Sequence, residues 1–226
     1  MFNKKSILVL FIDRNRFQFY GANFTGVETL DVPEAYLRDL DVVNHDGLYT
    51  LVKQWIKQHS LSGVQLILVF AETSYFEKVF SSAQPAEQET EIIKFLDAVP
   101  FESAITKVYD VPNGKRPVAI NKALYEAIRQ GFLLQGLPTK GAIPIFTLGA
   151  LGTRRALDTE MGEYVLKNID ALLRQSLIEV QDSSAPSPQG PAGQMAAPAK
   201  KSNLPLLLGA FGVLLIILLV VVFLFR

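Results

Sequence analysis

The stretch SILVLFIDRNRFQFYGANF, residues 6–24, decides the fold because it joins two strands through a short charged turn. The apolar run that ends at Ile12 predicts a buried strand, and the segment from Arg16 onward predicts a strand that returns beside it. Asp13 stands at the turn, where several phosphate-binding folds carry an acid followed by small residues. The turn therefore either holds a nucleotide or only connects two strands.

The composition excludes several kinds of site. The chain has 226 residues, and 22 Lys and Arg balance 22 Asp and Glu, so we expect no basic surface for nucleic acid. Cysteine is absent, which excludes disulfides, zinc–thiolate sites and thiol nucleophiles. His45 and His59 are too few for a His-rich metal centre. We expect no metal site and no cofactor.

The C-terminal part of the sequence predicts a membrane span. Residues 204–225 read LPLLLGAFGVLLIILLVVVFLF, and as a helix they would extend roughly 33 Å, enough to cross a hydrocarbon core of ~30 Å. Residues 182–203 are rich in Pro, Ala, Gly and Ser and predict a flexible linker. The N-terminus has no apolar stretch long enough for a secretory signal. We therefore expect a single-pass, tail-anchored protein whose residues 1–181 form a cytoplasmic domain.

Strand and helix patterns alternate through residues 6–180. The patterns predict strands over residues 6–12, 16–23, 27–32, 64–70, 73–82, 104–111, 116–121 and 141–151. They predict helices over residues 45–60, 85–100, 121–136 and 158–180. This alternation indicates an α/β domain with a mixed sheet.

Residues near the predicted helix ends have structural explanations. Asp46 is placed to cap the helix that follows it, which makes an acid–base role for the His45-Asp46 pair unnecessary. His59 falls at the C-terminal end of the same helix, where its charge suits the helix dipole. Asn121 is expected to cap the helix over 121–136, and Pro85 suits a first helical turn. With no serine in a nucleophile elbow either, we expect no enzyme activity.

The middle of the chain resembles the first lobe of the PilM family of type IV pilus assembly proteins, which has an actin-like, ribonuclease H-like fold. The resemblance rests on VQLILVFAETSYFEKVF at residues 64–80, on EIIKFLDAVPFE at 91–102 with Val99-Pro100-Phe101-Glu102 at the signature position, and on the order of elements over 116–151. The cytoplasmic domain of the type II secretion L protein (GspL) and the division protein FtsA are more distant relatives. The resemblance implies a small subdomain, inserted at about residues 71–115.

The same resemblance bears on the turn at Asp13. In nucleotide-binding relatives, glycine and serine follow the acid, so that backbone amides approach the phosphates. Here Arg14, Asn15 and Arg16 follow Asp13. After Leu151 the sequence shows neither a second phosphate hairpin nor an adenosine motif, so we expect the second lobe to be missing. The turn is expected to connect strands only. The alternative is an actin-like nucleotide binder completed by a second chain, in which Asp13 and Arg14 would matter.

The aromatic residues of the inserted segment have two explanations. Phe76, Phe80 and Phe101 suit the core of a small subdomain. The family resemblance implies instead a groove that accepts a short peptide of a PilN-like membrane partner, and Phe76, Phe80, Pro100 and Phe101 would line it.

The sequence thus predicts a non-enzymatic scaffold or adaptor at the cytoplasmic face of a bacterial inner membrane, in a type IV pilus or type II secretion-like assembly platform. Its partners would be the membrane, through a single C-terminal span, and inner-membrane proteins of that platform, and a homo-oligomer is compatible with this role. A tail-anchored regulator with an unrelated α/β fold is a third hypothesis.

Overall fold

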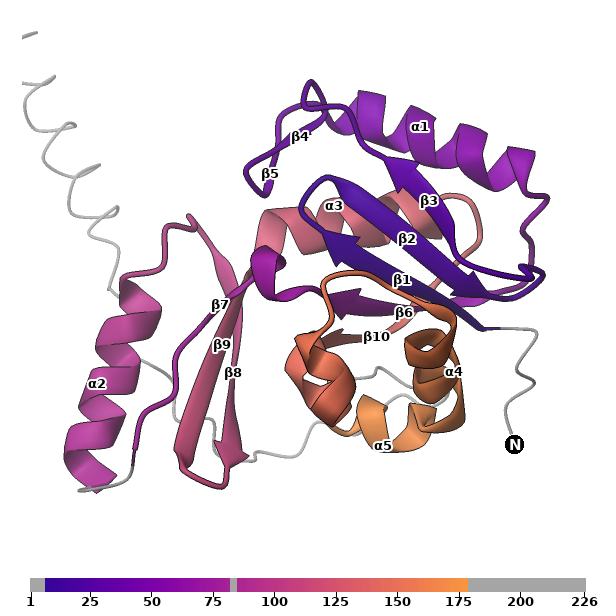
Figure 1. Cartoon of the computed structure of the whole chain (residues 1–226). Helices are drawn as coiled ribbons and strands as arrows, with labels where there is room; N and C mark the ends of the chain where they lie inside the picture. Colours follow the sequence, from indigo (N-terminus) through magenta and orange to yellow (C-terminus); the bar gives the residue numbers. More distant parts are fainter. Residues whose placement is uncertain (1–6, 82–84, 179–226) are drawn as a thin grey trace, which may run out of the picture. The chain divides into compact units, whose positions relative to one another are not determined.

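The computed structural model describes residues 7–81 and 85–178 (Figure 1). The predicted linker over 182–203 and the predicted span over 204–225 lie outside these ranges. Among the helices that are described, none is both long enough and apolar enough to cross a membrane.

The larger sheet has five strands in the order β10-β6-β1-β2-β3. They are β1 (Ile7–Asp13), β2 (Arg16–Gly21), β3 (Glu28–Asp31), β6 (Gln65–Phe70) and β10 (Thr139–Pro144). β1 is antiparallel to β2 and parallel to β6, β6 is parallel to β10, and β2 is antiparallel to β3, so β2 alone runs against the others. This order and direction are those of the ribonuclease H-like sheet. They confirm the predicted mixed α/β fold, and the fold that the PilM-like resemblance implied.

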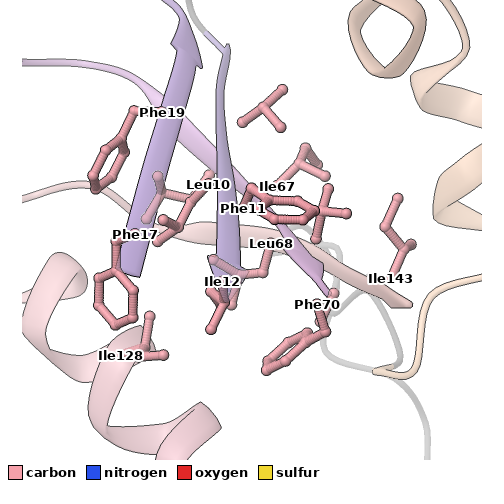
Figure 2. Close-up of a cluster of buried hydrophobic side chains, with 14 of the residues drawn as sticks. Leu10, Phe11, Ile12, Phe17, Phe19, Ile67, Leu68, Phe70, Ile128 and Ile143 are labelled. Atoms are coloured by element: carbon pink, nitrogen blue, oxygen red, sulfur yellow. The ribbon is translucent and has the colours of Figure 1, made fainter. Parts of the chain in front are cut away.

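The sheet is the core because its central strands are apolar on both faces. Residues 7–12 of β1 are at most 1% exposed, and residues 66–70 of β6 beside them are buried as well. Strands that are buried on both faces read as continuous apolar runs, which is how β1 and β6 were recognised in the sequence. Figure 2 shows the side chains of β1, β2 and β6 filling this core beside Ile128 of a neighbouring helix.

Helices cover both faces of the sheet. On one face lie α1 (His45–Gln58) and α3 (Lys122–Leu133), where Phe19 of β2 stacks on Trp55 with ring centroids 3.8 Å apart and also contacts Phe132. On the opposite face α4 (Thr159–Lys167) packs on β2, and α5 (Ile169–Leu173) packs on β10. Gly162 of α4 lies directly against Tyr20, the residue after Phe19.

A second, smaller sheet lies between β6 and α3 in the sequence. Its strand order is β7-β9-β8, formed by β7 (Phe76–Glu77), β9 (Gly114–Asn121) and β8 (Ala104–Val111), and α2 (Pro85–Asp97) packs on β9. We call the described part of residues 76–121 the second-sheet unit (Figure 1). The remaining elements are β4 (Leu37–Arg38), β5 (Asp41–Val42) and the 3₁₀ helices η2 (Glu72–Ser74) and η3 (Ile145–Thr153).

The helix caps are confirmed at one position and corrected at another. Asn121 caps α3 as predicted, because its side-chain oxygen accepts from the amides of Ala123 and Leu124. The prediction that Asp46 caps α1 is wrong. The helix begins at His45, and Asn44 is the cap, accepting from Gly47 N at 2.8 Å. Asp46 lies inside the first turn, where its charge still suits the dipole.

Three predicted elements are shorter than expected. The helix over 158–180 is divided at Asn168, whose φ of −113° is not helical, into α4 and α5. The strand over 141–151 ends at Pro144, after which the chain turns into η3. The strand over 73–82 reduces to β7 and an isolated bridge between Phe80 and Lys115.

Candidate functional site

The turn between β1 and β2 is held by side chains that follow β6. The Asp13 carboxylate accepts a hydrogen bond from Thr73 Oγ1 at 2.6 Å and forms an ion pair with Arg16. Thr73 belongs to η2, directly after β6, so the acid is fixed by the neighbouring parallel strand. Both carboxylate oxygens have protein partners.

The backbone of the same turn is also engaged. The amide of Arg14 donates to Ser74 Oγ at 3.0 Å, and the Ser74 hydroxyl donates to the Ile12 carbonyl at 2.8 Å. Ser74 is fully buried, and Arg14 has a φ of 51° with its side chain exposed. A phosphate-binding hairpin needs amides that are free to meet an anion. In this turn the Arg14 amide already has a partner within the chain.

A half-buried polar cluster lies where the second sheet begins. Glu77 of β7 faces Arg116 of β9, with 3.7 Å between the Glu77 Oε2 and Arg116 Nη1 atoms, and the Arg116 guanidinium lies 4.4 Å from the centre of the Phe146 ring. Glu77 Oε2 and Arg116 Nε are buried without a hydrogen-bond partner. Burial, ahead of any charge, raises the pKa of Glu77 above its ordinary value, and the positive charge of Arg116 opposes that shift. Burial likewise raises the pKa of Tyr75, and the nearby charge of Glu77 adds to it.

β8 contributes a second set of contacts. Lys107 Nζ donates to the carbonyl of Ser176 at 2.6 Å, and Tyr109 Oη donates to the carbonyl of Gln175 at 2.8 Å. Burial lowers the pKa of Lys107. The Tyr109 ring also meets Phe146 edge-on, with centroids 5.0 Å apart. The second sheet is thus attached along β8 to the main chain that follows α5.

Asn121 joins β9 to α3 and to the β4–β5 hairpin. Besides capping α3, its side-chain amide donates to the Leu40 carbonyl at 3.1 Å and to Asp41 Oδ1 at 2.9 Å. It is 5% exposed and is the last residue of β9. One buried amide therefore orients β9, α3 and the β4–β5 hairpin together.

The four residues suggested as a peptide groove do not share one surface. Phe76 is 39% exposed and meets Phe101 edge-on, with centroids 5.3 Å apart, and Pro100 beside Phe101 is exposed. Phe80 is only 5% exposed and lies against Phe95 of α2. The structure therefore brings Phe76 and Phe101 together at a surface and places Phe80 beneath α2.

Exposed apolar side chains gather on the second-sheet unit. Within residues 7–81 and 85–178, eight large hydrophobic residues are exposed, and half of them belong to this unit: Phe76, Val79, Ile93 and Val108. Grouped exposed apolar side chains indicate an interaction surface more often than scattered ones do. In the same ranges, no three His, Asp or Glu side chains form a group that could hold a metal ion.

Local sequence patterns do not indicate the cluster around Glu77. Glu77 and Arg116 are 39 positions apart, and Lys107 meets a carbonyl that is 69 residues away. Such pairs depend on strand register, which local patterns do not encode.

No family model matches the chain, and no curated protein does. Several solved structures are similar to it, and three of them are described here. The first is the PilM–PilN type IV pilus biogenesis complex, with 13% sequence identity, a TM-score of 0.40, and coverage of 61% of this chain and 46% of that chain. The second is the cytoplasmic domain of EpsL, an inner-membrane component of the Vibrio cholerae type II secretion system, with 11% identity, a TM-score of 0.37, and coverage of 63% and 58%.

The third is a Bacteroides thetaiotaomicron protein of unknown function with an actin-like ATPase fold, with 12% identity, a TM-score of 0.33, and coverage of 64% and 54%. The chain spans about half the length of these solved proteins. The assignment of the fold rests on the strand order and directions described above.

Proposed function

We propose that this chain is a membrane-tethered, non-enzymatic adaptor of a type IV pilus or type II secretion-like assembly platform. It holds partner proteins at the cytoplasmic face of the inner membrane, and its second-sheet unit is the recruiting surface. The apolar segment over 204–225 supplies the anchor, and the linker over 182–203 lets the domain reorient. Tethering raises the effective concentration of the domain for partners in the same membrane.

The observation that carries the proposal is the surface aromatic pair of Phe76, which is exposed, and Phe101, which is half-buried. Aromatic side chains in contact with one another at a surface are suited to anchoring a peptide, because they bury a large area on binding. They lie next to Pro100, on a unit that Lys107 and Tyr109 bind to the segment after α5 and that Asn121 binds to the β4–β5 hairpin. A rigidly held surface loses little freedom when a partner binds.

The engaged turn at Asp13 supports the non-enzymatic part of the proposal. Its carboxylate and the Arg14 amide have partners inside the chain, so a nucleotide would have to displace Thr73, Arg16 and Ser74. No observation on the described residues favours the nucleotide-binding alternative.

The test uses the full-length chain in detergent micelles and a fluorescent peptide, the cytoplasmic N-terminal segment of a PilN-like protein from the same organism. Phe76→Ala and Phe101→Ala are each expected to weaken binding at least tenfold, about 1.4 kcal/mol, as aromatic anchors do. Tyr164→Ala is the matched control, because Tyr164 is an aromatic residue of similar exposure, 37%, on α4. Fluorescence anisotropy gives each Kd. Absence of binding by the wild-type chain, or equal losses in all three variants, would contradict the proposal.

A further inference from the structure

The outer edge of β8 is a long and regular strand edge. β8 is the end strand of its sheet and, among the described residues, pairs with β9 alone. The pairing runs without a break from the pair of Ala104 and Asn121 to the pair of Val111 and Gly114, so β8 has no bulge. β8 also contains no proline. Natural edge strands are usually shortened, bulged or blocked by proline to prevent pairing with another chain. β8 has none of these three features.

The register shows which backbone groups face outward. Every second residue pair of an antiparallel ladder shares hydrogen bonds. At one end of the hairpin, a two-residue turn connects the paired residues Val111 and Gly114. Just past the other end of the two strands, Lys122 N donates to the Ser103 carbonyl at 3.0 Å. Both pairs belong to the same alternating set, so odd-numbered residues of β8 bond to β9. Pro117 of β9 has no amide hydrogen and so cannot donate to β8. It faces Val108, an even-numbered residue, which agrees with even-numbered residues not bonding to β9.

The amides and carbonyls of the even-numbered residues therefore point away from β9. These residues are Ala104, Thr106, Val108 and Asp110. Val108 is 41% exposed, and Thr106 and Asp110 are exposed as well. An added strand would find four consecutive bonding positions.

The sequence of β8 is complementary to itself about Val108. If a second β8 pairs antiparallel with its centre at Val108, each Val108 faces its twin, each Thr106 faces an Asp110, and each Ile105 faces a Val111. Each Lys107 faces a Tyr109, so the charged residues meet uncharged ones. No like charges meet in this register. Centring the pair one residue earlier would instead place Lys107 directly opposite Lys107.

The charged side chains of β8 do not block its edge. The Lys107 amine is held by the Ser176 carbonyl and points to the main-sheet side, and Asp110 is paired with Lys115 on β9 at 2.7 Å. The strand is otherwise rich in β-branched and aromatic residues, which favour pairing.

We propose that two copies of this chain associate through their β8 edges, antiparallel and centred on Val108, to form one continuous six-stranded sheet. The interface is isologous, since the same edge serves both copies. It is separate from the Phe76–Phe101 surface, and it does not depend on the proposed adaptor role.

Single cysteines test this interface, because the chain has none of its own. In a hydrogen-bonded antiparallel pair the two Cα atoms lie about 5.5 Å apart, within the range that a disulfide spans. Full-length Val108→Cys in detergent micelles, treated briefly with copper–phenanthroline in air, is expected to form a disulfide dimer on a non-reducing gel. Val79→Cys is the matched control, because Val79 has nearly the same exposure, 43%, and lies in the same second-sheet unit.

Thr106→Cys tests the register. Centred on Val108, the two Thr106 residues are four positions apart along the pair, roughly 14 Å, too far for a disulfide. Thr106→Cys alone is therefore expected to cross-link no more than Val79→Cys. A mixture of Thr106→Cys and Asp110→Cys is expected to form the heterodimer, because these positions face each other.

A blocked edge completes the experiment. Thr106→Pro removes an amide that faces outward and leaves the β8–β9 hydrogen bonds intact. Added to Val108→Cys, it is expected to lower cross-linking to the level of Val79→Cys, with thermal unfolding of the variant confirming that the chain is folded. Equal cross-linking of Val108→Cys and Val79→Cys would overturn the proposal and leave the edge to a different chain. Strong self-cross-linking of Thr106→Cys would overturn the register.

Discussion

The two sheets of this molecule use their residues in opposite ways. Residues 7–12 of β1 are at most 1% exposed, whereas only Tyr109 of the eight β8 residues is buried. The buried side chains Phe80, Ile92 and Ala119 of the second-sheet unit lie outside the main hydrophobic cluster. The main sheet therefore carries the stability of the fold. The second sheet is attached by polar contacts and by Tyr109, Val118 and Ile120, which join the main hydrophobic cluster. The rest of its surface is left for recognition.

The largest expected effect separates the two cores. Phe11→Ala in β1 is expected to lower the free energy of unfolding by about 4 kcal/mol, because a fully enclosed site cannot collapse around the cavity. Phe80→Ala is expected to cost about 2 kcal/mol or less, because its small cluster under α2 can close up. Denaturant unfolding of the full-length chain, followed by fluorescence of the single tryptophan, Trp55, measures both. Equal losses would show that the second sheet is as much a core as the first.

The next largest effect on stability is expected at Asn121, the last residue of β9. Asn121→Ala removes a cap and leaves the Leu40 carbonyl without its donor, so we expect a loss of about 2–3 kcal/mol. Asn44→Ala is the matched control, since it removes an exposed cap of α1 alone and should cost about 1 kcal/mol. The same unfolding measurement compares them. Similar losses would mean that Asn121 acts only as a cap and that its bonds to the β4–β5 hairpin add little.

A smaller effect on the free energy of unfolding is expected from pH, through Glu77 of β7. Because burial raises the pKa of Glu77, the folded state binds a proton more readily than the unfolded state does. Stability contributed by this proton is present below the ordinary glutamate pKa and is lost as pH rises through the raised value. Glu77→Gln should therefore show a shallower decline of stability over that pH window than the wild-type chain. Parallel curves would show that Glu77 is charged in both states.

The smallest effect is expected from nucleotide. A ligand at one hundred times its dissociation constant adds about 2.7 kcal/mol to the free energy of unfolding. We expect millimolar Mg-ATP to leave the thermal midpoint of the full-length chain unchanged, because the groups of the Asp13 turn are engaged. A shift that Asp13→Ala abolishes would instead support the nucleotide-binding alternative and make the turn a functional site.

The sequence by itself determined the elements whose signals are local. The apolar runs gave β1 and β6, the strand–turn–strand pattern gave the β1–β2 hairpin, and Asn121 was recognised as a cap from its place before an apolar period. Continuous burial and capping act over a few residues, so they can be read from neighbours in the chain. The same local signals failed at the start of α1, where Asp46 was predicted as the cap but Asn44, two residues earlier, is the cap. Local signals do not fix the start of a helix to the residue.

Only the tertiary structure decided the contacts between distant segments. Asp13 meets Thr73 sixty residues away because β1 and β6 lie side by side in parallel, and Glu77 meets Arg116 because of the register of β7 on β9. It also decided that Phe80 is covered by α2 while Phe76 stays exposed, although both are phenylalanines of one short segment. Which amides and carbonyls of β8 point away from β9 depends in the same way on how the hydrogen bonds between the two strands alternate. A change of register by one residue would reverse it, and no local pattern fixes that register.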